Sequence, residues 1–290
     1  PLAAAWHRRG GGVGCATAAG AAQRTGNLFQ VECDENGFAI ETGERDIQRV
    51  GQAVVLELLS RGHLVLGYDR HPSPNLRNAF VADLSDTETL AEAMDGVETL
   101  IHLAATPDDV DDVPGELFPP NINSLYHVME TARMAGVRRI VLPSSGQVNW
   151  HRSLNGPWPI DEKALTTPKG WYAATKMFLE SIGYSYSMNH NMSVIVARLG
   201  WCPRDEDQVR EIAADMNFKD VYLSPGDAGR FFAGCVEAAD DVSHAVLYAT
   251  SKPVDVLRYD LGLAKAIANF EPQEQWPDGT EIITGQRWED

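Results

Sequence analysis

Residues 37–70 read GFAIETGERDIQRVGQAVVLELLSRGHLVLGYDR, and this stretch decides the fold. The short apolar run at 38–42 predicts a strand. The apolar positions of 51–62 follow helical spacing as far as Gly62, a residue type that commonly ends a helix. The run at 64–69 is apolar almost throughout, as a strand covered on both faces should be. Strand, helix and buried strand in this order indicate a parallel sheet with helices on both faces.

The same alternation continues towards the C-terminus. Five more strands are predicted, at 78–84, 99–105, 138–145, 193–200 and 244–250. Helical patterns occur at 87–94, 123–136 and 170–189. We therefore expect an α/β fold, a Rossmann-like doubly wound parallel sheet of about seven strands, with ligands bound beyond the carboxyl ends of the strands.

Composition limits the functional classes. The chain has 290 residues with 44% apolar content, enough for one large α/β domain. Its formal charge of −17 argues against nucleic acid and anionic membrane as partners. No apolar run reaches the roughly 18 residues that a membrane span needs. The four cysteines, Cys15, Cys33, Cys202 and Cys235, form no C-x-x-C pair, so we predict no metal site, no disulfide framework and a reducing, cytoplasmic location.

Residues 1–36 differ in composition from the rest of the chain. They contain no acidic residue before Glu32, are rich in Ala and Gly and lack apolar periodicity, which predicts a disordered tail. The glycines at 10–14 mimic a phosphate loop, but residues 1–9 before them do not read as a strand. An organelle transit peptide, also rich in Arg and poor in acids, is a less favoured alternative.

The turn at 42–51 is the candidate phosphate-binding loop. A dinucleotide site needs glycines where the backbone turns tightly and approaches the pyrophosphate, with helix N-terminal amides facing the phosphates. Gly43 and Gly51 can fill the first and last of these positions, but Gln48 occupies the middle one, and the loop is two residues longer than usual. An ordinary strand-to-helix loop explains this turn equally well.

Asp69 favours the nucleotide-binding interpretation. It ends the second predicted strand, at about the 20-residue offset where an acidic residue hydrogen-bonds the adenosine ribose hydroxyls. A carboxylate at that position repels a 2′-phosphate. NAD is therefore favoured over NADP, although Arg70 follows directly in the sequence.

The predicted helix at 170–189 carries a candidate catalytic pair. In YAATK, Tyr172 and Lys176 are four residues apart and share one helical face. The lysine charge can lower the tyrosine pKa from about 10 towards working pH and make the phenol a proton-transfer group. This spacing also occurs by chance, and a half-buried Tyr beside a solvated Lys is the structural alternative.

Taken together, these features resemble the extended short-chain dehydrogenases/reductases, which include NAD-dependent sugar epimerases, dehydratases and uronate dehydrogenases. The resemblance runs from about Phe38 to the C-terminus. It rests on the order of several motifs: TG…VG, YDRHP, VADLSD, LIHLAA, NINSLYHVMETARMAGVRRIVLPSS and YAATK. It implies NAD as the cofactor and a single domain at 37–290, mainly NAD-binding over 37–200 and mainly substrate-covering over 201–290.

The resemblance also implies roles for individual residues. Ser145 completes a catalytic set with Tyr172 and Lys176, and Asn121 matches a recurring structural Asn. The implied cofactor-binding residues are Gly43, Arg49, Val50, Gly51, Asp69, Asp83, Leu84, Leu103, Ala104, Ala105, Asn121, Tyr172 and Lys176. The implied substrate-binding residues are Ser145, Gln147, Trp201 and Arg210.

Within this family the chain most resembles the uronate dehydrogenases. This resemblance rests on three segments in the C-terminal third of the chain: VARLGWCPRDEDQVR, LSPGDAGRFFAGCVEAA and FEPQEQWPDG. Arg210 falls where those enzymes carry the arginine that clamps the sugar carboxylate. A surface ion pair with nearby acids is an equally weighted alternative for this residue. The chain departs from those enzymes at Gly146 and Gln147, which replace an Asn-His pair, and at Trp201, which replaces a small Ser.

The implied function is NAD-dependent oxidation of a sugar or sugar acid at the anomeric carbon, giving a lactone. Tyr172, as phenolate, would take the hydroxyl proton, Ser145 would hold that oxygen, and Lys176 would lower the tyrosine pKa. A sugar epimerase or dehydratase and a non-catalytic NAD-sensing or scaffold protein remain as alternatives. The helices at 123–136 and 170–189 carry apolar residues on more than one side, which fits either a homodimer interface or core packing.

Overall fold

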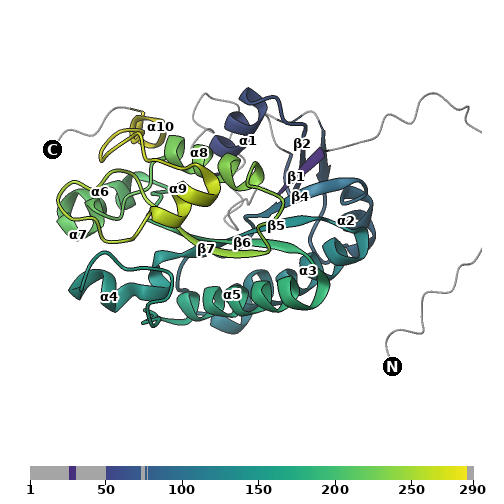
Figure 1. Ribbon diagram of the computed structural model, residues 1–290, viewed down its shortest axis with the longest axis horizontal. Helices are drawn as coiled ribbons and strands as arrows, with labels where there is room; N and C mark the ends of the chain where they lie inside the picture. The colour runs from purple at the N-terminus through teal and green to yellow at the C-terminus, as the bar shows by residue number, and fades with distance from the viewer. Residues whose placement is uncertain (1–25, 31–49, 73–75, 77, 286–290) are drawn as a thin grey trace, which may run out of the picture.

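The computed structural model describes residues 26–30, 50–72, 76 and 78–285, and these residues form a parallel sheet between layers of helices (Figure 1). The strands are β1 (Gly26–Gln30), β2 (Val65–Asp69), β3 (Ala79–Val81), β4 (Val97–His102), β5 (Arg139–Ser145), β6 (Ser193–Leu199) and β7 (His244–Ala249). The α-helices are α1 (Val50–Ser60), α2 (Thr87–Ala93), α3 (Ser124–Ala135), α4 (Trp150–Asn155), α5 (Trp171–His190), α6 (Glu206–Ala214), α7 (Met216–Lys219), α8 (Pro225–Val236), α9 (Gly262–Ala268) and α10 (Glu281–Thr284). Three short turns of helix are η1 (Val113–Leu117), η2 (Pro119–Asn123) and η3 (Gly146–Asn149).

The sheet has the strand order β3-β2-β1-β4-β5-β6-β7, and all of its strand pairs are parallel. The chain builds outward in one direction from β1 to β3 and then in the other from β4 to β7. This reversal beside β1 opens a crevice at the carboxyl ends of the strands, where doubly wound sheets bind ligands. The predicted fold class, a Rossmann-like α/β sheet, is confirmed.

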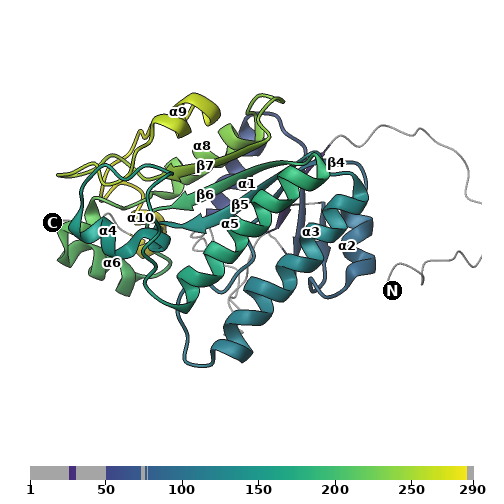
Figure 2. The ribbon, with the colours of Figure 1, turned by 60° about the horizontal axis from the view of Figure 1, so that its bottom comes forward.

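Two hydrophobic cores lie on the two faces of the sheet. Helices α1, α8 and α9 cover one face, and α2, α3 and α5 cover the other (Figures 1 and 2). In α3 the buried residues Leu125, Val128, Met129 and Ala132 follow the i, i+3, i+4, i+7 spacing that places them on one side of a helix. The periodicity that predicted these helices therefore reflects one-sided burial against the sheet.

The first strand lies earlier in the chain than predicted. Residues 26–30 form β1, whose backbone pairs with β2 on one edge and with β4 on the other. The prediction of a disordered tail over 1–36 is therefore wrong for these five residues, because composition averaged over a long segment does not detect a short strand held by backbone pairing on both edges. The strand predicted at 38–42 lies outside the described residues.

The region after β6 forms a cover near the carboxyl edge of the sheet. Helices α6, α7 and α10 gather there (Figure 1), around a small separate core that includes Val209, Ile212 and Trp276. Among the helices in the described part of the chain, none has both the length and the apolarity to cross a bilayer.

Candidate active site

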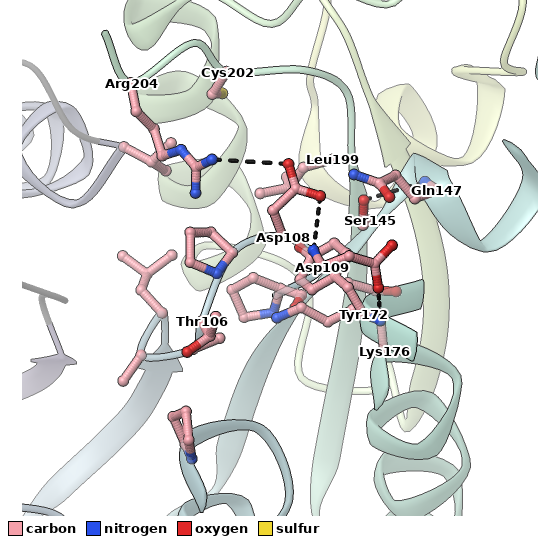
Figure 3. A pocket seen from close by; sticks show the side chains of 18 of the residues that line it. Thr106, Asp108, Asp109, Ser145, Gln147, Tyr172, Lys176, Leu199, Cys202 and Arg204 are labelled. Carbon is pink, nitrogen blue, oxygen red and sulfur yellow. Dashed lines mark hydrogen bonds and ion pairs between the residues drawn. The ribbon is translucent and has the colours of Figure 1, made fainter. Parts of the chain in front are cut away.

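A cavity of about 1230 Å³ lies at the carboxyl ends of the strands, and it contains most of the predicted site residues. Those in its lining are Val50, Gly51, Asp69, Asp83, Leu84, Leu103, Ala104, Ala105, Ser145, Gln147, Tyr172, Lys176 and Trp201. Figure 3 shows the part of this cavity around the predicted catalytic residues Ser145, Tyr172 and Lys176. The lining does not include Asn121 or Arg210, and Gly43 and Arg49 lie outside the described residues.

One end of the cavity has the groups that an adenosine ribose and a pyrophosphate require. Asp69 ends β2, is 7% exposed and accepts a hydrogen bond from the His71 N–H at 2.8 Å. Helix α1 begins at Val50, and Val50 and Gly51 line the cavity, so the positive end of that helix lies beside it. A buried carboxylate, which can accept hydrogen bonds from ribose hydroxyls, and a helix N-terminus, whose amides can donate to phosphates, suit the binding of NAD.

Asp83, Leu84 and His127 line the same end of the cavity. The Asp83 carboxylate accepts hydrogen bonds from the Ser85 hydroxyl at 2.6 Å and the Ser85 N–H at 2.8 Å, and these two bonds lower the pKa of Asp83. The Nδ1 atom of His127 is buried without a hydrogen-bond partner among the described residues. An unsatisfied buried nitrogen in a cavity wall is a suitable contact for a polar group of a bound cofactor.

The predicted catalytic residues come from two elements that meet at the centre of the cavity. Ser145 ends β5, and its Oγ accepts a hydrogen bond from the Gln147 N–H at 3.1 Å. Tyr172 and Lys176 lie on successive turns of α5 and are 7% and 6% exposed. The Lys176 Nζ donates to the Pro143 carbonyl at 3.1 Å and lies 5.5 Å from the centre of the Tyr172 ring. The lysine is therefore buried beside the phenol and not solvated.

His102, at the end of β4, is a buried neighbour of this pair. Burial first, and then the positive charge of Lys176, lower the pKa of His102 to about 3. The imidazole is therefore neutral at physiological pH. The positive charge in this part of the site is therefore that of Lys176.

A buried ion pair joins helix α5 to strand β6. Glu180, one turn after Lys176, accepts hydrogen bonds from Arg198 Nε at 2.9 Å and Arg198 Nη2 at 2.8 Å. It also accepts one from the Ser144 hydroxyl at 2.6 Å. Arg198 Nη1 in turn donates to the Tyr248 hydroxyl at 2.9 Å. This network joins α5 to β5 and β6 directly beneath Ser145.

Asn121 has a structural position. It is not among the residues that line the cavity, so the geometry does not support its predicted contact with the cofactor. Its Oδ1 accepts from the Thr106 N–H at 2.7 Å, and its Nδ2 donates to the Thr106 carbonyl at 3.1 Å and to Thr175 Oγ1 at 3.0 Å. The side-chain amide is occupied by these bonds, and the residue is only 6% exposed. Asn121 thus joins the loop after β4 to helix α5.

Arg210 is not among the residues that line the cavity, so the geometry does not support the prediction that it reaches the substrate. Arg210 lies on α6 with its side chain 56% exposed, and it pairs with Glu206 at 2.5 Å and Asp207 at 2.8 Å. The residues of α6 that line the cavity are Gln208 and Glu211. Because successive helical residues point about 100° apart, Arg210 faces away from that side. The observed contacts are those of the alternative interpretation, a surface ion pair.

The substrate end of the cavity contains residues that the sequence did not point to. The ring of Phe218 contacts that of Trp201 in an edge arrangement, with centroids 4.9 Å apart, and lies 6.0 Å from that of Trp150. The Lys169 ammonium lies over the Trp150 ring, and Arg204 Nη2 lies 3.9 Å from Asp108 Oδ2. Asp108 and Arg204 stand in the loops after β4 and β6, so the rule that ligands bind beyond the carboxyl ends of strands could have found them.

Comparison with known proteins agrees with this arrangement. A sequence model described as the NAD dependent epimerase/dehydratase family matches residues 49–201, more than half of the chain. L-arabinose 1-dehydrogenase (NAD(P)(+)) of Haloferax volcanii is 28% identical over 201 residues, which are 64% of this chain and 78% of the relative. NAD-dependent glucose-6-phosphate dehydrogenase of the same organism is 26% identical over 250 residues, which are 78% of this chain and 90% of the relative.

Solved structures share the fold. A glucuronic acid dehydrogenase from Chromohalobacter salexigens superposes with a TM-score of 0.64 at 21% identity and covers 91% of each chain. At this identity the similarity establishes the shared architecture and leaves the substrate to be argued from the site itself.

Proposed function

This chain belongs to the NAD dependent epimerase/dehydratase family, and on that premise we propose that it is a dehydrogenase that oxidises a sugar or sugar acid at the anomeric carbon, giving a lactone. The observation that carries the proposal is the position of Tyr172 and Lys176. They lie buried beside each other, in the same cavity as Ser145 and the Asp69 carboxylate. One cavity thus combines a proton-transfer group with the groups that would bind the cofactor.

Bound NAD would supply the acceptor for the hydride that leaves the anomeric carbon. Tyr172, as phenolate, takes the proton of the hydroxyl on that carbon, and the Ser145 hydroxyl holds the same oxygen. Lys176 places a positive charge beside the phenol, which favours the phenolate. The C–H and O–H bonds of the substrate break, a C=O bond forms, and the products are a lactone, NADH and a proton.

The residues that would hold NAD follow from the cavity wall. The Asp69 carboxylate would accept hydrogen bonds from the adenosine ribose hydroxyls, and the α1 N-terminus would face the pyrophosphate. Asp83 and Leu84 would contact the adenine, and Leu103, Ala104 and Ala105 would line the rest of the cofactor site. A carboxylate at position 69 disfavours a 2′-phosphate and so favours NAD over NADP.

A sugar fits the other end of the cavity. Trp150, Trp201 and Phe218 form an apolar wall of the kind that packs against the C–H face of a sugar ring, and the Gln147 Oε1 atom is buried without a hydrogen-bond partner among the described residues. That oxygen would accept a hydrogen bond from a sugar hydroxyl. The relatives compared above are named as dehydrogenases of L-arabinose, glucose 6-phosphate and glucuronic acid, and all three compounds are sugars or sugar derivatives.

The decisive experiment compares Tyr172→Phe with the wild-type chain on a panel of aldoses and uronic acids. NADH formation is followed by its absorbance, and NAD affinity by calorimetry. We expect the wild type to produce NADH steadily with at least one sugar. The variant should lose about 10²- to 10⁴-fold in kcat with little change in NAD affinity, because only the proton acceptor is removed. Tyr184→Phe, on an exposed part of the same helix, is the matched control.

The alternatives give different results in the same experiment. Interconversion of sugar isomers without net NADH would favour an epimerase, and tight NAD binding without turnover on the whole panel would favour a sensing or scaffold protein. A Tyr172→Phe variant with a near-normal rate would remove Tyr172 from the mechanism.

A further inference from the structure

Helix α5 receives its N-terminal cap from a distant part of the chain. The helix follows Gly170, which has no side chain to accept a hydrogen bond from the amides of the first turn. The Tyr172 N–H instead donates to Oδ1 of Asp109 at 2.7 Å. Asp109 stands in the loop after β4 and lines the cavity. The turn that carries Tyr172 is thus held by another element of the fold.

Gly170 leaves the space that this carboxylate occupies. A Cβ atom at position 170 would lie 2.5 Å from Oδ2 and 3.0 Å from Cγ of Asp109. The backbone of Gly170 is extended, with φ of −162°, a conformation that any residue adopts. Glycine is therefore required at this position for space and not for its conformational freedom.

Asp109 is one member of a row of contacts across the cavity (Figure 3). Its N–H donates to Oδ1 of Asp108 at 2.9 Å, and Oδ2 of Asp108 lies 3.9 Å from Nη2 of Arg204 in the loop after β6. The row joins the loops after β4 and β6 to the start of α5. These two loops and the start of α5 contribute residues to the lining at both ends of the cavity.

A second connection joins the same loop to the same helix. The Thr106 N–H donates to Asn121, and Asn121 donates to Thr175 on α5. Leu103–Ala105, directly before Thr106, line the cofactor end of the cavity. The loop after β4 is therefore fixed to α5 both at Thr175 and, through Asp109, at Tyr172.

We propose that Asp109 is a positioning residue for Tyr172, which it holds in a fixed place relative to the loop that lines the cofactor end of the cavity. The proposal rests on the proton-transfer role given to Tyr172 under Proposed function. Proton and hydride transfer need their partners at near-contact distances, and a misplacement of about 1 Å can cost on the order of 10²-fold in rate. A cap supplied within α5 would stabilise the helix equally well, but it would leave the loop joined to α5 only through Asn121 and Thr175.

Three variants separate the positioning role from simple capping. Asp109→Ala should lower kcat at least about tenfold with NAD affinity unchanged, because Tyr172 loses its attachment. Asp109→Asn keeps an Oδ1 acceptor in place and should retain kcat to within about threefold. In Asp109→Ala/Gly170→Ser the serine hydroxyl can cap α5 locally, in the space that the carboxylate has vacated. This double variant should recover the melting temperature of the wild type but not its kcat.

Hydrogen exchange provides a readout independent of turnover. In the double variant we expect peptides from the first turn of α5 to regain protection and peptides covering 103–110 to remain more exposed to exchange than in the wild type. Asp111→Ala is the matched control, an acid of the same loop outside the cavity lining.

Recovery of kcat with the local serine cap would overturn the proposal, as would a near-normal kcat or an unchanged 103–110 exchange pattern in Asp109→Ala. If the wild type oxidises no sugar on the panel, the proposed function fails, and the exchange patterns still decide whether Asp109 holds the loop and the helix together.

Discussion

The ion pair of Glu180 and Arg198 predicts a large loss of stability when one partner is changed. The two side chains are 13% and 5% exposed and share two charge-assisted hydrogen bonds, at 2.8 and 2.9 Å. Glu180→Gln keeps the side-chain volume, removes one of the two acceptors and leaves a buried guanidinium without a counter-charge. We expect a loss of about 3 kcal/mol in the free energy of unfolding, since hydrogen bonds to charged groups contribute about 1.5–3 kcal/mol and breaking a buried pair costs about 3–5 kcal/mol.

Urea denaturation at neutral pH measures this loss, and a surface pair of the same chain provides the control. Glu206→Gln removes the charge that faces exposed Arg210 and should cost about 0–1 kcal/mol. Replacing both buried partners, as Glu180→Leu/Arg198→Met, should recover most of the loss, because no unpaired charge remains. Equal losses for Glu180→Gln and Glu206→Gln would refute the assignment of a buried, mutually dependent pair beneath the catalytic helix.

Two further predictions concern pH and substrate charge. Because burial and Lys176 lower the pKa of His102 to about 3 from 6.5, the unfolded chain takes up this proton first as pH falls. The free energy of unfolding should decrease by about 1.4 kcal/mol per pH unit between about pH 6.5 and about pH 3 from this group alone. In urea denaturation at several pH values, His102→Gln should flatten that slope. Arg204 lines the substrate end, and among the described residues its guanidinium has only a long contact, to Asp108. Arg204→Gln should therefore lower kcat/KM about tenfold for a uronic acid and less than twofold for a neutral aldose. Equal losses of kcat/KM on both sugars in steady-state assays would contradict the prediction that Arg204 binds a substrate carboxylate.

The fold was largely predictable because its strands and helices are local patterns in the sequence. Apolar runs such as 193–200 and 244–250 coincide with β6 and β7, which are buried on both faces by flanking helices. The family and the NAD cofactor were predicted from the order of the motifs, and both are confirmed. The strand at 26–30 was missed, because pairing with β2 and β4 involves residues distant in sequence and leaves no periodic signal in five residues.

The site was predictable where a residue ends a strand or begins a helix, and less so elsewhere. Asp69, Ser145 and Tyr172 are placed by such ends, and all three line the cavity. Arg210 was identified by counting from the end of a strand, but a count does not specify which face of a helix a residue occupies. The contact of Asp109 with Tyr172 joins positions 63 residues apart, and only the folded chain brings these residues together.

At Gly146, where the sequence differs from the uronate dehydrogenases, the structure has no room for a side chain. A Cβ atom at Gly146 would lie 2.6 Å from the Tyr259 hydroxyl and 3.3 Å from the Leu199 carbonyl. Tyr259 has no room to withdraw, because it is 3% exposed and its ring stacks on that of Tyr248 with centroids 4.5 Å apart. An asparagine at position 146 would therefore need a different residue at 259. Position 146 therefore contributes only backbone to the cavity wall, and the neighbouring side chains that remain there are those of Gln147, Trp150, Trp201 and Phe218, on which the recognition of a sugar would depend under the proposed function.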